Sequence, residues 1–184
     1  DAAVAAAVAA AQATPVGPSA QPGRHIGPVV NRRQYERVQS LIETAMAEGA
    51  RLVAGGPGRP EGLNRGFFVR PTVFADVSNQ MTIAREEVFG PVLSIIPFDS
   101  EDEAVAIAND TPYGLTNYIQ TTDAARLKRL ARVLKSGDIQ TNGKGTGPGA
   151  PFGGVKASGI GREGGIHGLM EFLEVKAVSG WPEA

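Results

Sequence analysis

The sequence feature that most constrains the fold is the uncharged run V-L-S-I-I-P-F at residues 92–98, which directly follows Gly90 and Pro91. β-Branched and aromatic residues are enriched in strands, and a Gly-Pro pair ends whichever element comes before it. An apolar run of this kind is typical of a strand buried on both faces, as in a parallel sheet covered by helices. The run therefore predicts a buried strand at residues 92–98 of an α/β domain.

Candidate helices and strands alternate along the rest of the chain. Apolar periodicity and capping residues predict helices at residues 2–13, 31–48, 101–108, 123–135 and 166–173. Short β-branched runs predict strands at residues 52–53, 67–74, 116–120, 138–141 and 174–178. Pro71 would place the strand at residues 67–74 at an edge or a bulge, because proline cannot donate to a ladder. The alternation predicts a mainly parallel sheet with helical crossovers.

Two of these helices have clear start signals. Asn31 can cap the helix that runs through Glu48, and Gly49 is well placed to end it. Ser100 and Glu103 form a capping box ahead of the helix at residues 101–108. The first of these helices carries an apolar stripe formed by Tyr35, Val38, Leu41, Ile42, Ala45 and Met46.

Composition excludes several classes of function. The chain has 184 residues, 42% of them hydrophobic and 20% charged, which is enough for one domain with a real core. The net charge of −1 and the lack of a basic block give no indication of nucleic-acid binding. No apolar stretch approaches the roughly 20 residues that cross a bilayer. The alanine-rich start has no basic segment typical of a signal peptide, so we expect a cytoplasmic location.

The chain contains no cysteine. Disulfides, thiolate metal sites and a thiol nucleophile within these residues are therefore excluded. His25 and His167 are isolated from each other and from carboxylates at metal-ligand spacing, so no metal site is expected.

Glu86 and Glu87 stand just ahead of the apolar run. Consecutive residues of an extended chain point to opposite sides, so we expect the two carboxylates to have different roles. One would face a ligand while the other meets a cation or water.

Four blocks of the sequence resemble, in order, motifs of the NAD(P)-dependent aldehyde dehydrogenases. Residues 85–91 (R-E-E-V-F-G-P) resemble the family's E-E-x-F-G-P, and residues 66–74 resemble G-x-F-x-x-P-T-V-F. Residues 109–115 (N-D-T-P-Y-G-L) resemble N-x-x-x-Y-G-L, and residues 151–164 resemble P-F-G-G-x-K-x-S-G-x-G-R-E. The resemblance implies an enzyme that oxidises an aldehyde to a carboxylic acid with NAD or NADP.

The same resemblance implies how the chain is organised. Residues 1–173 would be the C-terminal part of the family's catalytic domain, and residues 174–184 would be an oligomerisation strand and tail of a homodimer or homotetramer. The family's nucleophilic cysteine, general-base glutamate and nucleotide-binding domain lie upstream of the stretch that residues 1–31 resemble. No catalytic residue is therefore expected in this chain, and the chain alone is expected to be inactive.

The resemblance also assigns candidate site residues. Glu87 would accept hydrogen bonds from the nicotinamide ribose hydroxyls. Phe89 would lie beside the nicotinamide, with an ordinary core phenylalanine as the alternative. Phe152 would lie near the substrate mouth, with Asn142 and Lys144 in the loop that leads there. Lys144 would favour a polar or acidic aldehyde, with a purely solvated lysine as the alternative.

Residues 159–164 match G-x-G-x-x-G, but no strand precedes them and no βαβ unit follows. We therefore interpret this run as structural.

A second hypothesis for the whole chain also remains open: a stand-alone, non-catalytic module that self-associates or binds a partner, because a missing domain would leave apolar surface exposed.

Overall fold

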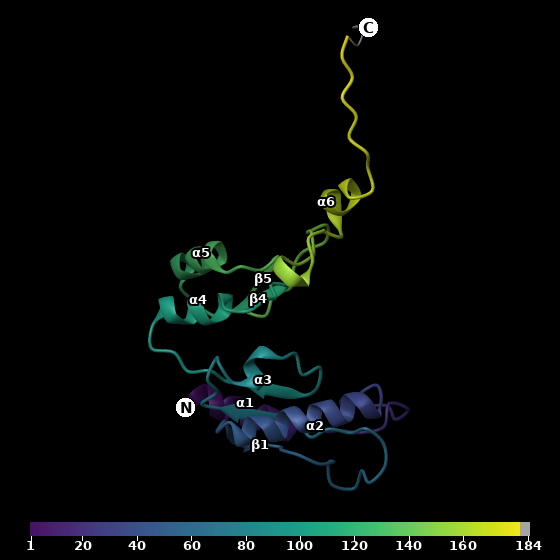
Figure 1. The fold of residues 1–184 in the computed structure, drawn as a ribbon, viewed down its shortest axis with the longest axis vertical. Helices are drawn as coiled ribbons and strands as arrows, with labels where there is room; N and C mark the ends of the chain where they lie inside the picture. Colours follow the sequence, from purple (N-terminus) through teal and green to yellow (C-terminus); the bar gives the residue numbers. More distant parts are fainter. Residues whose placement is uncertain (181–184) are drawn as a thin grey trace. The chain divides into compact units, whose positions relative to one another are not determined.

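The computed structural model describes residues 1–180 and divides the chain into two compact units, Asp1–Phe98 and Asp99–Ala184. The first unit contains α1 (Ala2–Ala13), α2 (Arg32–Ala47), β1 (Arg51–Ala54), β2 (Thr72–Ala75), α3 (Thr82–Arg85) and β3 (Val92–Ser94). The second contains α4 (Glu101–Asn109), β4 (Thr116–Ile119), α5 (Ala124–Val133), β5 (Asp138–Thr141), the 3₁₀ turn η1 (Lys156–Ser158) and α6 (Gly165–Met170). Figure 1 labels the helices α1 to α6 and the strands β1, β4 and β5.

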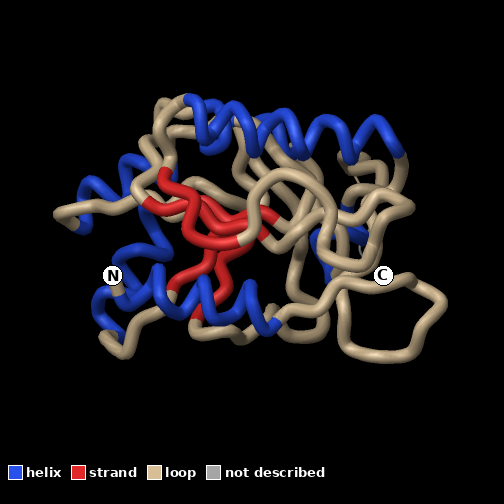
Figure 2. Tube along the Cα trace, turned by 90° about the horizontal axis from the view of Figure 1, so that it is seen from below, coloured by secondary structure: helices blue, strands red, loops and turns tan. Residues whose placement is uncertain are grey.

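The first unit is built on a three-stranded sheet in the order β1-β2-β3. β2 runs antiparallel to β1 and parallel to β3, with Thr72 opposite Val92. The chain between β1 and β2 is a long loop, and loops of this kind (tan in Figure 2) connect the short strands and the helices. The structure thus confirms an α/β fold, with one antiparallel pairing at β1.

Helix α2 provides most of the core of the first unit. The Asn31 side chain accepts a hydrogen bond of 2.8 Å from the Gln34 amide, which confirms Asn31 as the cap. The helix ends as predicted at Gly49, whose amide donates to the Met46 carbonyl, while the Ala50 amide donates to Ala45. The apolar stripe packs on the sheet, and its fully buried members share the core with Phe74: they are Val38, Ile42 and Ala45.

The prediction for residues 92–98 is wrong in length and in burial. β3 covers only Val92–Ser94, and the side chains of Leu93 and Phe98 are 50% and 59% exposed. β3 is an edge strand of its sheet, so only β2 pairs with it within the unit. Apolar residues tend to be buried, but whether they are buried depends on which elements the fold packs against them.

The strand predicted at residues 67–74 is also shorter than expected. β2 begins at Thr72, immediately after Pro71, and it is the central strand and not an edge. Pro71 therefore precedes the ladder and costs it no hydrogen bond. The irregularity in register lies in β1, between Leu52 and Ala54.

In the second unit, β4 and β5 form a parallel pair joined through α5, with Thr116 opposite Asp138. The start of α4 follows the predicted capping pattern with one difference. Ser100 Oγ accepts from the Glu103 amide at 3.1 Å, while the Glu103 carboxylate accepts from Asp99 and not from Ser100. α5 starts after Asp123 and ends at Val133, ahead of the predicted stop at Gly137.

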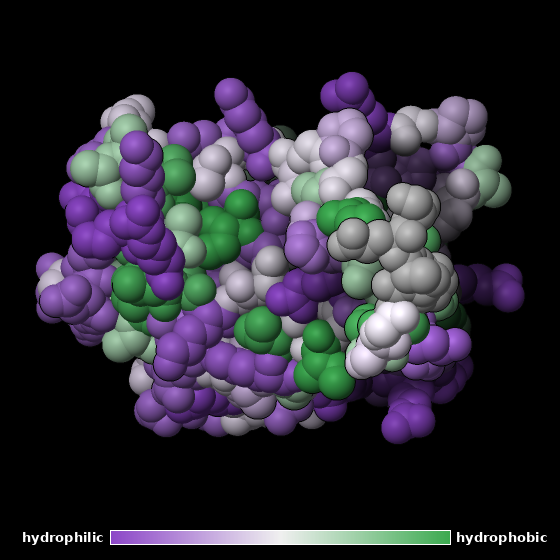
Figure 3. Space-filling model, turned by 90° about the horizontal axis from the view of Figure 1, so that it is seen from above, coloured by the Kyte–Doolittle hydropathy of each residue, from purple (hydrophilic) through white to green (hydrophobic). Residues whose placement is uncertain are grey.

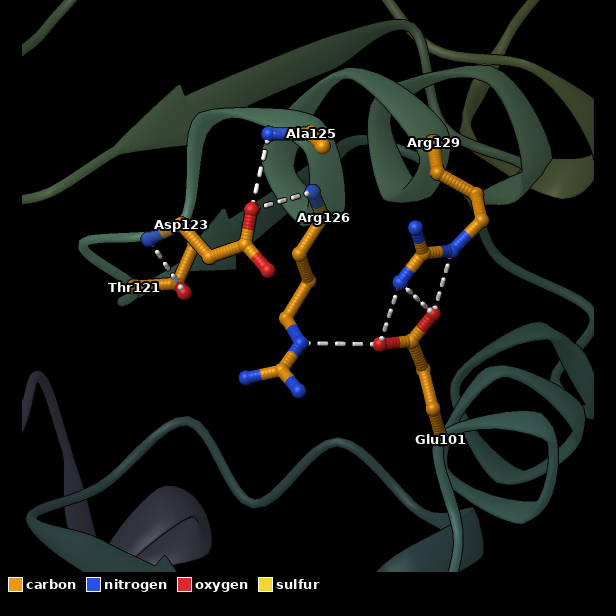
Figure 4. Close-up of polar contacts among 6 residues, drawn as sticks. All are labelled: Glu101, Thr121, Asp123, Ala125, Arg126 and Arg129. Carbon is orange, nitrogen blue, oxygen red and sulfur yellow. Dashed lines mark hydrogen bonds and ion pairs between the residues drawn. The ribbon is translucent and has the colours of Figure 1, made fainter.

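An exposed ion-pair cluster links α4 to α5. Glu101 at the start of α4 accepts hydrogen bonds from Arg129 at 2.7 Å and from Arg126 at 2.9 Å (Figure 4). The hydrogen bond from Arg129 is the main cause that lowers the pKa of the Glu101 carboxyl. The Asp123 carboxylate accepts from the amides of Arg126 and Ala125, and these bonds lower its pKa. Asp123 thus fixes the start of α5, and Glu101 ties the start of α4 to α5.

The predicted C-terminal strand is not formed in the single chain. α6 ends at Met170, short of residue 173, and residues 174–178 pair with no described strand. Val175 is 87% exposed. Figure 3 shows one face of the molecule, on which apolar residues (green) reach the surface among polar ones (purple). A strand needs a partner ladder, and the described residues of the unit offer none to this segment. The remaining residues of the predicted tail, 181–184, lie outside the described residues.

Across residues 1–180, no helix is both long enough and apolar enough to cross a membrane.

Candidate functional site

The loop that carries Glu86 and Glu87 places the two carboxylates differently. Glu86 Oε2 lies 3.0 Å from Arg37 Nη2 on α2 and forms an ion pair with it. The Glu87 side chain is exposed and contacts no hydrogen-bond or ion-pair partner among the described residues. Glu86 thus pairs with a cation, as expected for one of the two carboxylates. The Glu87 carboxylate is free to accept hydrogen bonds from a ligand.

The main chain of the same loop is held on α2. Gln34 Nε2 donates to the carbonyl oxygens of Val88 at 2.8 Å and of Phe89 at 3.0 Å. Arg37 Nη2 lies 3.4 Å from the carbonyl oxygen of Glu87. These contacts hold three successive carbonyl groups of the motif on one rigid helix.

Phe89 is the unusual residue of this loop. Its φ is +50°, in the left-handed region, and its ring is 74% exposed. A non-glycine residue in a sparsely populated backbone region costs on the order of 1 kcal/mol, so the surrounding contacts must maintain it. The next residue, Gly90, packs directly on α2, where an added Cβ would lie 2.9 Å from Val38 Cγ2. The loop therefore presents an acceptor carboxylate and an aromatic ring on a fixed backbone.

Sequence reasoning did not find Gln34 and Arg37. Both are polar residues one turn apart on α2, so the periodicity marks them only as part of the exposed face. Their partners lie about fifty residues further on, and no local signal links the two segments.

In the second unit, Asn142 is used by the framework. Its Oδ1 accepts from the Thr121 amide at 2.9 Å, and its Nδ2 donates to the Thr121 carbonyl at 3.0 Å. Asn142 has a φ of +52° and its own amide donates to Ile119. Both ends of the side-chain amide are thus occupied, and the residue fixes the point at which the loop at residues 143–151 leaves β5.

Lys144 is exposed, and its ammonium group has no partner among the residues that the structure describes. Its backbone amide donates to Thr141 at 3.0 Å, which keeps the start of the loop close to β5.

Phe152 is held through its backbone. Its amide donates to Glu163 at 2.8 Å, and its carbonyl accepts from the Glu163 amide at 2.7 Å. The ring is 38% exposed and lines a surface cavity of about 470 Å³, together with Leu115, Arg162 and Phe172.

The run at residues 159–164 lies between η1 and α6 and follows no strand. Its Arg162 Nη1 donates to the carbonyl oxygens of Gly154 at 2.6 Å and Gly161 at 2.9 Å. The Arg162 side chain thus joins this run to Gly154.

Glu87 and Phe89 therefore belong to the first unit, and Asn142, Lys144 and Phe152 to the second. Within residues 1–180, no three His, Asp or Glu side chains gather in a way that could hold a metal ion.

Comparison with known proteins gives the family. The sequence profile of the aldehyde dehydrogenase family matches residues 1–178. A curated relative from Staphylococcus haemolyticus is 51% identical over 166 residues, which make up 90% of this chain and 35% of the relative. The chain therefore spans about a third of the length of such relatives.

Solved structures agree with this result. The aldehyde dehydrogenase of Bartonella henselae is 55% identical with a TM-score of 0.96, over 98% of this chain and 38% of that one. A mutant of aldehyde dehydrogenase C from Pseudomonas syringae, solved with NAD+ and octanal, is 47% identical with a TM-score of 0.93, over 98% and 37%. The chain belongs to the aldehyde dehydrogenase family and corresponds to a part of the proteins that it matches.

Proposed function

We propose that this chain is the C-terminal part of the catalytic domain of an NAD(P)-dependent aldehyde dehydrogenase, which oxidises an aldehyde to a carboxylic acid. The observation that carries the proposal is the loop at residues 86–90. It holds a carboxylate with no described partner beside an exposed ring, on a backbone fixed by α2. Similar proteins solved with NAD+ support the same assignment.

Glu87 and Phe89 would hold the nicotinamide end of the cofactor. An ionised carboxylate has two acceptor oxygens and suits the vicinal hydroxyls of a ribose. The exposed Phe89 ring offers an apolar face that limits movement of a flat ring placed beside it. The bound cofactor, NAD or NADP, would accept hydride from the substrate.

Phe152, Asn142 and Lys144 would shape the entrance for the aldehyde. Phe152 supplies an apolar wall, and Asn142 fixes where the loop starts. The Lys144 ammonium group would attract an acidic or polar aldehyde.

The role of Glu87 can be tested in the longer protein that contains this chain. Glu87→Gln removes the charge but not the shape, and we expect it to raise the KM for NAD(P) roughly tenfold, the size of one charge-assisted hydrogen bond. Glu43→Gln is the matched control, because Glu43 is an exposed glutamate of α2 outside the candidate loop. Equal cofactor KM values for the wild type and the Glu87→Gln variant would show that Glu87 does not bind the cofactor.

The 184 residues alone are expected to be inactive. They contain no cysteine, and positioning of the cofactor does not replace a missing nucleophile. The measurement is aldehyde-dependent formation of NADH or NADPH by the purified 184-residue chain, with the longer protein as the positive control. Turnover by the short chain would contradict the prediction, and no turnover by either protein would contradict the proposed activity.

A further inference from the structure

Two sequence motifs that are more than thirty residues apart form one hydrogen-bonded unit in the second half of the chain. The segment at residues 155–158 lies against residues 109–114, the end of α4 and the turn after it. Val155 and Ala157 donate their amides to the carbonyls of Gly114 and Pro112, both at 2.9 Å. Ser158 Oγ accepts from the Gly114 amide at 3.0 Å.

Lys156 is the central residue of this contact. Its Nζ donates to the carbonyl oxygen of Asn109 at 2.9 Å and to that of Thr111 at 3.0 Å. The carbonyls at the end of a helix lack partners within the helix and carry partial negative charge, so an ammonium group is a favourable partner for them. Lys156 therefore closes the C-terminal end of α4 from another part of the chain.

The backbone of Lys156 is strained to reach this position. Its φ is +56°, a region that non-glycine residues other than Asn and Asp rarely adopt. An observed backbone outlier is a reason to look for a function, and here the outlier places the ammonium group on the two carbonyls.

The anchored segment at residues 155–158 is separated from Phe152 by a short connection. Gly153 and Gly154 connect them, and at Gly154 an added Cβ would lie 2.5 Å from Ser158 Cβ. The short connection leaves little freedom between the anchor and the Phe152 ring. Phe152 itself is held by its backbone pair with Glu163, and the residues before it pack closely on Gly164 and Gly165.

We infer that Lys156 is a positioning residue for Phe152: by holding residues 155–158 on the end of α4, it fixes the aromatic wall of the aldehyde entrance. The inference rests on the proposed function for the role of Phe152, but the contact itself does not depend on it. Lys156 touches neither substrate nor cofactor in this assignment and acts only through the loop.

The test uses the longer protein that contains this chain. Lys156→Met keeps most of the length of the side chain and removes the charge and the donors, while Lys128→Met on the exposed face of α5 is the matched control. We expect Lys156→Met to lower kcat/KM for the aldehyde roughly tenfold, as the loss of a charge-assisted hydrogen bond would, and to leave the KM for NAD(P) unchanged. Lys156→Arg, which keeps charge and donors, should restore part of the loss.

A double-mutant cycle separates positioning from general damage. In a Phe152→Ala background, Lys156→Met should have a much smaller effect on kcat/KM than in the wild type, because the group that it positions is gone. Full additivity of the two substitutions would overturn the inference. Ser158→Ala, which removes a single bond of the same contact, repeats the test if Lys156→Met fails to fold.

A second readout does not depend on activity. With 4-fluorophenylalanine at position 152, the ¹⁹F spectrum should show one narrow resonance in the wild type and the Lys128→Met variant, and a broadened or split one in Lys156→Met. An unchanged spectrum in Lys156→Met would overturn the inference. If the wild type turns over no aldehyde, the proposed function fails, and the spectrum alone then decides whether Lys156 positions residue 152.

Discussion

At the scale of single residues, the loop at residues 86–90 depends on close packing against α2. Phe89 adopts a left-handed backbone that its own side chain disfavours, and the Gln34 side chain holds it there. Gly90 lets the backbone approach Val38, a fully buried residue of the core. The position of Glu87 is therefore set by residues that do not contact a ligand in the proposed site.

Gly90→Ala should consequently destabilise the protein. The added methyl group meets the side chain of Val38, and overpacking of a core typically costs about 1–3 kcal/mol of unfolding free energy. Gly145→Ala is the control, because an added Cβ there meets nothing within 4 Å. Urea unfolding of the two variants measures the difference, and equal midpoints would show that the loop relaxes away from α2.

At the scale of elements, the helix starts depend on carboxylates and hydroxyls that face backbone amides. Asp123 caps α5 through the amides of Ala125 and Arg126, at 2.8 and 3.0 Å. These bonds favour the ionised carboxylate and lower its pKa in the folded state. A lowered folded-state pKa means that the stabilisation is present above the unfolded-state pKa and is lost as the pH falls through the folded-state pKa.

The expected consequence is a stability difference that depends on pH. Asp123→Ala should be less stable than the wild type near pH 7, and the gap should narrow below about pH 4, where the unfolded aspartate itself becomes protonated. Asp123→Asn keeps an acceptor oxygen and no charge, so its stability should follow pH less steeply than that of the wild type. Thermal unfolding followed by circular dichroism across this range measures the three proteins. A constant gap between the wild type and Asp123→Ala would contradict the assignment.

The same local signals explain which elements the sequence could predict. β5 is found at the residues expected, 138–141, and α4 extends only one residue beyond its predicted end. Caps and periodicity act over a few residues and are visible in the chain itself. The burial of residues 92–98 depends on the neighbours of an edge strand, and no run of residues encodes these neighbours locally.

In the candidate site, too, local sequence signals were visible in the chain and long-range contacts were not. The resemblance proposed Glu87, Phe89 and Phe152, whereas the long-range contacts of Gln34 and Lys156 were found only in the fold. Their partners are 45 to 55 residues away in the chain. Side-chain contacts over such separations leave no periodic pattern.

At the scale of the whole molecule, residues 174–178 carry exposed apolar side chains without a described partner strand. Val175 and Val178 are 87% and 56% exposed. We expect this segment to pair with a second copy of the protein, because an apolar segment with free backbone groups favours association.

Val175→Lys should therefore shift the longer protein toward smaller assemblies. A charged side chain at the contact would face desolvation when the copies associate, whereas Lys176→Ala changes a neighbouring residue without adding charge. Sedimentation velocity over a range of concentrations measures the distribution of species. The same distribution for both variants and the wild type would place the contact between copies elsewhere.

The glycines of the second unit also bear on how this family could diversify. At Gly137 there is no room for a side chain, because an added Cβ would overlap the carbonyl oxygen of Gly153. At Gly145 and Gly147, by contrast, an added Cβ meets nothing within 4 Å and the backbone is not left-handed. We propose that residues 144–148 tolerate new side chains whereas the packed frame around Gly137 does not. A library at these residues in the longer protein would test whether they set the preference for the aldehyde.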